Sequence, residues 1–210
     1  MNRTLLGLAA IGVSAVPLHG QSLRLAIGAT GVSFAEVGEA LQYDGPGGNA
    51  MIDFRFGKFM VQGEGYIARL VPDAETGLTE DLDMRQADLR IAYFLSPALA
   101  IQIGASGREA TPENSTTNVG YGRIGLISEN RLGSIARIWV RGAYLPSPKF
   151  SGGGSAEFAF EIGLGTWIGT SNGRFGARIE YDYQRIDRQV NDVDAGQQLM
   201  VARLSFEVGF

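Results

Sequence analysis

The chain has 210 residues, with 18 Lys and Arg against 22 Asp and Glu, one His, no Cys and 45% hydrophobic residues. The lack of Cys excludes a disulfide framework and a thiol nucleophile, and the acidic balance argues against nucleic acid as a partner. After the first twenty residues, no stretch reaches the ~18 consecutive apolar residues of a transmembrane helix, so a helical membrane protein is not expected.

The first twenty residues have the pattern of an export signal. Asn2 and Arg3 give a short positive start, and the apolar run from Leu5 to Val16 is too short to span a bilayer. Cleavage after the small residue Gly20 suits this pattern, and a cut near Ala15 is the alternative. We therefore expect a signal peptide over residues 1–20 and a single mature domain over residues 21–210.

The rest of the chain alternates apolar and polar residues in about ten segments. The clearest is 175–184, in which Phe175, Ile179 and Tyr181 share one face while Arg178 and Glu180 share the other. The remaining segments of this kind are 23–29, 52–56, 59–67, 87–93, 99–106, 120–127, 135–144, 157–165 and 199–210. This period of two predicts an all-β chain: one antiparallel up-and-down transmembrane β-barrel of about ten strands, with eight as the alternative.

The connections between these segments alternate in length. Those at 57–58, 96–98, 129–133 and 169–173 are short, and those at 38–49, 69–84, 107–118, 146–155 and 187–196 are longer and polar. Short and long connections must then lie at opposite ends of the sheet. Outer-membrane barrels have this arrangement, with short periplasmic turns and longer external loops.

Alternation alone fits either a membrane barrel with a polar interior or a soluble barrel with an apolar interior. Two features favour the first. Charged residues occupy mid-strand positions on one face, and aromatic residues such as Phe56, Phe59, Tyr144 and Tyr181 gather near strand ends on the other, as in interfacial girdles. We therefore expect the charged face to line the lumen.

The expected lumen network contains acidic and basic residues in near balance, almost all of the basic ones being Arg. Its members are Asp53, Arg55, Glu64, Asp88, Arg90, Arg137, Arg141, Glu157, Glu161, Arg178, Glu180, Asp182, Arg203 and Glu207, with Arg24 and Arg123 on the same face. A lumen of eight to ten strands is barely wider than its side chains, so Arg and carboxylates would pair and block it.

This predicts a non-enzymatic barrel with a plugged lumen and a structural or surface-interaction role. Two alternatives stay open. One is a narrow porin-like diffusion channel for small solutes, and the other is a soluble periplasmic lipid-binding barrel with the two faces reversed.

The last strand carries a recognisable pattern. Leu204, Phe206, Val208 and Phe210 alternate with polar or small residues up to an aromatic final residue. The segment resembles the C-terminal assembly signal of bacterial outer-membrane barrels, although a Tyr often stands where this chain has Val208. The resemblance implies a bacterial outer-membrane location, contact with outer-membrane lipid and lipopolysaccharide, and recognition by the barrel-assembly machinery during biogenesis. We expect a monomer.

Residues with catalytic or cofactor chemistry are scarce. Enzymatic outer-membrane barrels resemble one another in relying on a His general base, and the single His here is His19, inside the predicted leader. A carboxylate pair of Glu161 and Glu180 is conceivable, but a structural ion network is favoured. The G-x-G-x-x-G match at 120–125 continues as a strand, and the acidic stretches 73–83 and 191–196 lack EF-hand spacing. We therefore expect no catalytic site, no cofactor and no metal.

Overall fold

The computed structural model describes residues 21–36, 41–111, 117–191 and 193–210, and the predicted leader at 1–20 lies outside them. The long strands are β1 (Gln21–Glu36), β2 (Leu41–Phe56), β3 (Phe59–Pro72), β4 (Leu82–Ser96), β5 (Leu99–Thr111), β6 (Val119–Leu132), β7 (Ala136–Tyr144), β9 (Ser155–Gly169), β10 (Phe175–Val190) and β12 (Gln197–Gly209). The other elements are the two-residue strands β8 (Lys149–Phe150) and β11 (Val193–Asp194) and a short 3-10 helix, η1 (Ala74–Thr76). None of the described helical residues forms a segment long and apolar enough to cross a membrane.

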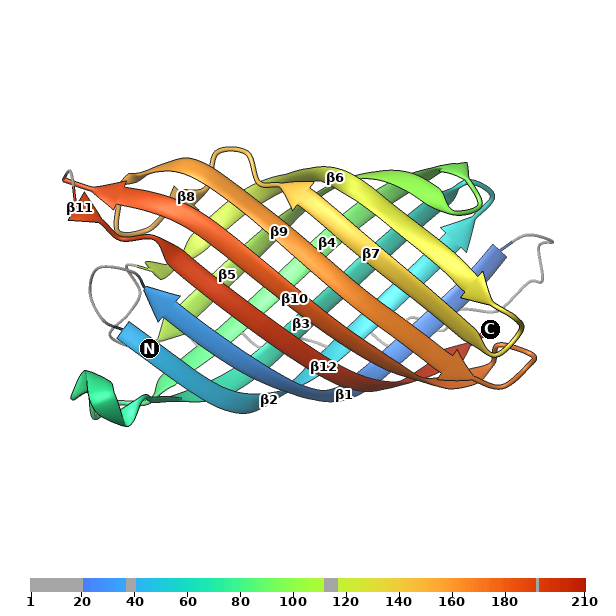
Figure 1. The fold of residues 1–210 in the computed structure, drawn as a ribbon, viewed down its shortest axis with the longest axis horizontal. Helices are drawn as coiled ribbons and strands as arrows, with labels where there is room; N and C mark the ends of the chain where they lie inside the picture. The colour runs from blue at the N-terminus through green and yellow to red at the C-terminus, as the bar shows by residue number, and fades with distance from the viewer. Residues whose placement is uncertain (1–20, 37–40, 112–116, 192) are drawn as a thin grey trace, which may run out of the picture.

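The ten long strands close into one antiparallel barrel (Figure 1). Each pairs with the next along the chain, and β12 pairs with β1 from Arg24↔Gly209 to Glu36↔Gln197. Closure leaves no long strand with an unpaired edge. The predicted all-β barrel of ten strands is confirmed, and the eight-strand alternative is wrong.

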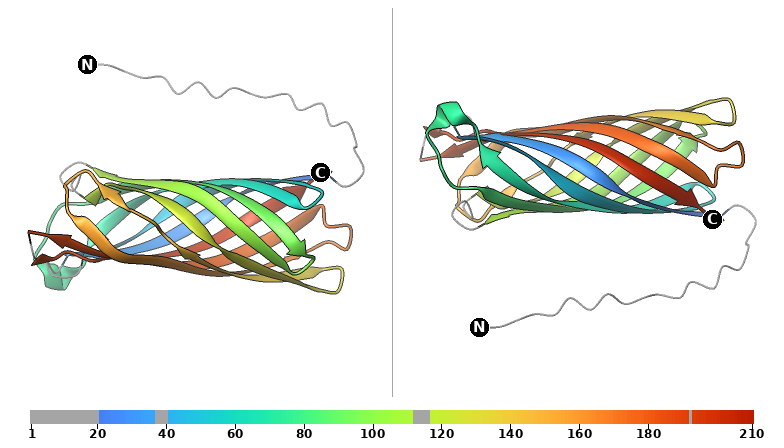
Figure 2. Two further views of the ribbon diagram at one scale, coloured as in Figure 1. Left: turned by 90° about the horizontal axis from the view of Figure 1, so that it is seen from above. Right: turned by 90° about the horizontal axis from the view of Figure 1, so that it is seen from below.

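The two ends of the barrel differ, as the connection lengths predict. Turns 57–58, 97–98, 133–135 and 170–174 lie at one end, which we call the short-turn end. The longer connections 73–81 and 145–154 lie at the opposite, long-loop end, where β5 and β10 end and β6 and β12 begin. Figures 1 and 2 show η1, β8 and β11 at the long-loop end, while β1 begins and β12 ends at the short-turn end.

The expected long connection at 38–49 is wrong, because β2 already begins at Leu41 and pairs with β1 as far as Glu36↔Leu41. The Gly residues in the first half of β2 are explained by strand packing and not by a loop. A Cβ atom at Gly45 or Gly47 would overlap a carbonyl oxygen of β3, that of Arg69 or of Ile67. Glycine therefore allows β2 and β3 to approach closely. The glycine-rich composition of this segment resembles that of a loop but belongs to a strand.

An exposed apolar belt surrounds the barrel. On β3, β4, β5 and β10 it covers nine residues each, namely 59–67, 87–95, 99–107 and 175–183, close to the 9–11 that a tilted strand needs to cross a bilayer. Within it Ile27 is 70% exposed and Ile67 is 69% exposed. At the long-loop edge of the belt, the next outward-facing residues are charged: Arg69, Arg85, Glu109 and Arg185.

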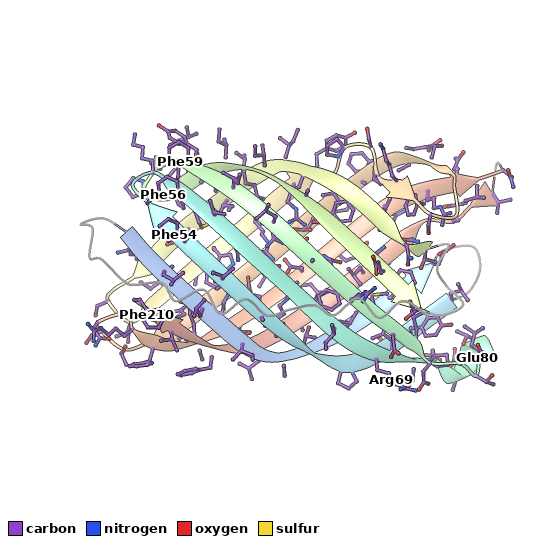
Figure 3. The ribbon with its side chains drawn as sticks, turned by 180° about the vertical axis from the view of Figure 1, so that it is seen from behind. Phe54, Phe56, Phe59, Arg69, Glu80 and Phe210 are labelled. Carbon is purple, nitrogen blue, oxygen red and sulfur yellow. The ribbon has the colours of Figure 1, made fainter. Side chains whose placement is uncertain are left out.

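Aromatic side chains mark both edges of this belt. At the short-turn edge the rings of Phe56 and Phe59 stack with centroids 5.5 Å apart, and Phe59 meets Tyr93 edge-on. Figure 3 shows Phe54, Phe56 and Phe59 together at this end and Arg69 toward the other. At the opposite edge the rings of Tyr144, Phe158, Phe160 and Tyr183 follow one another. The arrangement matches the aromatic girdles of membrane barrels.

The interior changes character along the barrel axis. Charged residues fill the middle, as expected, but two apolar clusters lie toward the long-loop end, among a few buried polar side chains. One cluster there includes Phe34, Leu70 and Leu82, and a second includes Leu145 and Ile186. Beyond the belt the outer face thus becomes charged, while the inner face becomes richer in apolar side chains.

Candidate functional site

The barrel wall directs almost all of the expected lumen residues inward. Because successive strand residues alternate between faces, one parity on each strand places charged side chains in the lumen and their neighbours outside. The inward set comprises Asp53, Arg55, Glu64, Asp88, Arg90, Arg137, Arg141, Glu161, Arg178, Glu180, Asp182, Arg203 and Glu207, together with Arg24 and Arg123. These residues converge in the middle and short-turn parts of the lumen.

Glu64 on β3 is one centre of the network. Its carboxylate lies 2.8 Å from Nη1 of Arg90, 3.3 Å from Nη2 of Arg203 and 3.8 Å from Nη2 of Arg141. The three arginines belong to β4, β12 and β7, so groups from different sides of the barrel meet on one carboxylate.

Glu161 on β9 is a second centre. Its Oε2 lies 2.6 Å from Nη2 of Arg123, and its Oε1 lies 3.6 Å from Arg90 and 3.8 Å from Arg141. Arg123 also contacts Asp88 at 3.1 Å. Arg90 and Arg141 are shared with Glu64, so the two centres form one connected cluster.

A third group lies nearer the short-turn end. Arg178 binds Glu180 through two hydrogen bonds, Nε to Oε2 and Nη2 to Oε1, both 2.7 Å long. Such fork-to-fork pairing is the strongest side-chain geometry for this ion pair. Glu207 completes the group, at 2.9 Å from Nη2 of Arg137 and 3.5 Å from Nη1 of Arg178.

Asp182 on β10 joins the same cluster through Arg141 of β7 and Arg203 of β12. Arg141 donates to both of its carboxylate oxygens, and Arg203 donates to Oδ2. Opposite charges are therefore interleaved across the lumen and are not segregated onto opposite walls.

Aromatic rings support the arginines at the short-turn end. The guanidinium of Arg137 lies 4.7 Å from the ring centroid of Trp167, and that of Arg178 lies 4.4 Å from the ring centroid of Trp139. Both rings lie against glycines: a Cβ atom at Gly165 would overlap Trp139, and one at Gly176 would overlap Trp167. The glycines thus make room for indoles that hold the arginines in place.

Two expected members differ from the prediction. Glu157 is exposed, so its assignment to the interior is wrong. The pairing of β9 with β10 shifts between Asp187 and Arg188, and this irregularity breaks the strict alternation that placed Glu157 inside. Asp53 is buried in the lumen but forms no ion pair with any described residue, and its Oδ1 has no hydrogen-bond partner among them.

Arg108 is a lumen residue that the sequence analysis missed. It is 2% exposed, donates to the side-chain oxygens of Gln184 and Gln197, and lies over the ring of Phe34. Gln184 in turn donates to the hydroxyl of Tyr121. Arg108 was missed because residues 107–118 were expected to form a loop. Arg108 nevertheless lies on the same inward face of β5 as Gln102 and Ser106.

The network offers no evident chemistry for catalysis. Glu180 is held by Arg178 and Glu161 by Arg123, so the conceivable acid and base pair consists of two ion-paired carboxylates. Within the described ranges, no group of three or more His, Cys, Asp or Glu could hold a metal ion. Residues 120–125 lie inside β6, as expected for a strand.

The sequence matches no protein-family model and no curated protein. Among solved structures it is similar to Ail, the attachment invasion locus protein of Yersinia pestis, with 14% identity and a TM-score of 0.45 over 92% of this chain and 100% of that one. It is also similar to Neisserial surface protein A, with 12% identity and a TM-score of 0.42 over 91% and 97% of the two chains. An outer-membrane channel from Pseudomonas putida F1 gives 10% identity and a TM-score of 0.45 over 97% and 100%.

Proposed function

We propose that the chain is a non-enzymatic barrel of the bacterial outer membrane, with a lumen blocked by paired charges and a structural or surface-interaction role. The main support for this function is that charged side chains on the inner wall of the barrel are buried. The side chain of Arg123 is 0% exposed and that of Glu207 is 1% exposed. A water-filled channel would expose the charged groups that line it, so burial of this degree supports an occluded lumen.

The apolar clusters at the long-loop end support the same proposal. Leu70 and Ile186 are 0% exposed, Leu82 and Leu145 are 1% exposed, and all four point into the barrel. A solute entering from this end would meet packed side chains before it reached the charges. Displacing a close-packed core is costly, because interiors are filled as tightly as organic crystals.

The apolar belt supports placement in a membrane. Its height suits a bilayer, aromatic rings mark both edges, and the residues beyond its long-loop edge are charged. A soluble lipid-binding barrel would instead bury these apolar residues inside. With short turns on the periplasmic side, the ring of Arg69, Arg85, Glu109 and Arg185 would lie at the lipopolysaccharide head groups.

The end of β12 supports assembly in the outer membrane. Leu204, Phe206 and Phe210 are 58%, 54% and 68% exposed on the outer wall, and Val208 is half-buried. They therefore present the alternating apolar row that the resemblance to an assembly signal requires. We expect the barrel-assembly machinery to read this row, and we expect the folded barrel to be a monomer.

Liposome swelling tests the proposal. The protein is refolded into liposomes, its folding is checked by heat-dependent gel mobility, and swelling is followed in isotonic arabinose, glucose and sucrose. The expected rate equals that of protein-free liposomes for every sugar. Swelling that falls with solute size would overturn the occluded lumen in favour of a diffusion channel, and failure to insert into liposomes would favour the soluble barrel.

A further inference from the structure

A cavity of about 420 Å³ opens at the short-turn end of the barrel. Its walls are the start of β1, the end of β12 and the turns that follow β6 and β9. Phe210, labelled in Figure 3, marks this end, and Trp167 contributes to the lining. It opens to the solvent on the side of the short turns, and its lining includes Arg24 and Arg137 from the short-turn edge of the charge network.

Four arginines line this cavity: Arg24, Arg131, Arg137 and Arg174. Within the described part of the chain, Arg131 and Arg174 have no carboxylate within ion-pair distance. Nη2 of Arg137 lies 2.9 Å from Oε1 of Glu207. Nε of Arg24 lies farther from the same oxygen, at 3.9 Å, so this ion pair is weaker.

Positive charge therefore exceeds negative charge at this mouth. Glu207 lies behind this lining, where it pairs with both Arg137 and Arg178. The described residues that line the cavity thus include four arginines and no Asp or Glu. Such an excess in a partly enclosed site creates a positive potential that attracts anions.

The remaining lining groups are suited to an oxyanion. Ser22, Ser134, Ser171 and Asn172 supply hydroxyl and amide donors beside the arginines. Arg137 is held against the ring of Trp167, which fixes one guanidinium before any ligand binds. Preorganised Arg forks with added hydroxyl donors are the usual means of binding phosphate in proteins.

We propose that this cavity, the short-turn vestibule, binds a phosphate group. The shared chemistry is a phosphate monoester or diester, and two sources could present it on this side of the barrel: a soluble phosphate or the head group of an anionic phospholipid. The site belongs to the barrel mouth, so it is independent of whether the lumen conducts.

The test uses the full barrel refolded in dodecyl maltoside, which carries no phosphate. Inorganic phosphate is titrated by calorimetry and by thermal unfolding, with chloride replacing it to keep the ionic strength constant. We expect saturable binding and a rising unfolding midpoint, since a ligand that binds only the folded state stabilises it.

The variant Arg131→Gln/Arg174→Gln removes the two lining arginines that form no ion pair with the described residues, so folding is expected to persist. It should weaken phosphate binding by about tenfold or more, because each lost charge-assisted contact is worth roughly one factor of ten. The matched control Arg69→Gln/Arg85→Gln removes two arginines at the long-loop end and should leave binding unchanged. Equal affinities in both double variants, or a response of the native protein no larger than with chloride, would overturn the site.

Short-chain phosphatidylglycerol, added below its micelle-forming concentration, separates the two sources. Tighter binding than inorganic phosphate, lost in Arg131→Gln/Arg174→Gln, supports the phospholipid head group. Equal or weaker binding, with the same loss in the variant, supports a soluble phosphate. Binding of the lipid that the variant retains in full contradicts the vestibule as the site.

Discussion

Nη2 of Arg90 lies 3.6 Å from Oε1 of Glu161, although their strands are far apart around the barrel. Strands β5, β6 and β7 separate β4 from β9 on one side, and β3, β2, β1, β12 and β10 separate them on the other. The pair therefore joins nearly opposite walls of the lumen. Direct contact across a barrel is possible only where the lumen is no wider than two side chains, so the network both fills the barrel and fastens its walls together.

Removing an arginine from the centre of this network should destabilise the barrel. Arg178→Ala leaves Glu180 without its fork partner and takes one cation from Glu207, and stranding a buried charge costs about 3 to 5 kcal/mol. Arg131→Ala serves as the control and should change stability little, because Arg131 is exposed and forms no ion pair with the described residues. Urea unfolding of both variants in vesicles gives the comparison. Equal midpoints would contradict a network that stabilises the fold.

A charge placed in the apolar belt should oppose insertion. Ile162 is 49% exposed in the middle of the belt on β9, and Ile162→Arg should cost about 2 to 4 kcal/mol in a bilayer. Val71 is 53% exposed on β3 but lies beyond Arg69, outside the belt, so Val71→Arg should be tolerated. The free energy of unfolding in vesicles is measured for both. Similar costs for the two substitutions would show that the belt edge is misplaced.

The change of polarity along the barrel axis predicts unequal effects of one substitution on a single strand. Ile186 on β10 is 0% exposed within an apolar cluster, so Ile186→Ala should open a cavity and cost about 2 to 5 kcal/mol. Ile179, on the same strand, is 50% exposed in the belt, so Ile179→Ala should cost less because it leaves no internal cavity. Chemical unfolding of the two variants decides the point. A larger loss for Ile179→Ala would refute an apolar core at the long-loop end.

The glycines beside the indoles predict a steric effect. Gly176→Ala would place a methyl group against Cε2 and Nε1 of Trp167 and should cost about 1 to 3 kcal/mol, as overpacking usually does. Gly142→Ala is the control, because nothing lies within 4 Å of its added atom. Replacing the indole in Gly176→Ala/Trp167→Leu should recover part of the loss, which a double-mutant cycle measures. Additive effects in that cycle would mean that the methyl group and the ring do not meet.

Alternation of side chains made most of the barrel predictable. A strand has only two faces, so Ile179 outside and Arg178 inside follow from parity alone, and ten such segments indicate ten strands. The wrong predictions fall where a strand breaks the strict alternation of its two faces, or where a strand has the composition of a loop. An irregular pairing of β9 with β10 moves Glu157 outside, and the close approach of β3 gives the start of β2 the composition of a loop.

The apolar clusters inside the long-loop end could not be predicted from the pattern in the same way. Parity places Leu70 and Leu82 on the same faces of their strands as Glu64 and Asp88, but it does not say that the polarity of a face changes along the strand. The partners within the network were also beyond prediction. Glu64 contacts arginines of three other strands. These contacts depend on the tilt and stagger of the strands in the closed barrel, and the sequence of a single strand does not reveal either.

The conductance of single barrels in a planar lipid bilayer tests the occluded lumen most directly. Folded protein is added to the bilayer in 1 M KCl at about 100 mV, and insertion is confirmed afterwards by recovery of the heat-modifiable form. Small ions probe a narrower path than sugars do, so this recording is the strictest test of the interleaved charges. An occluded lumen predicts a baseline equal to that of the bare membrane, and steady, uniform open events from the native protein would contradict it.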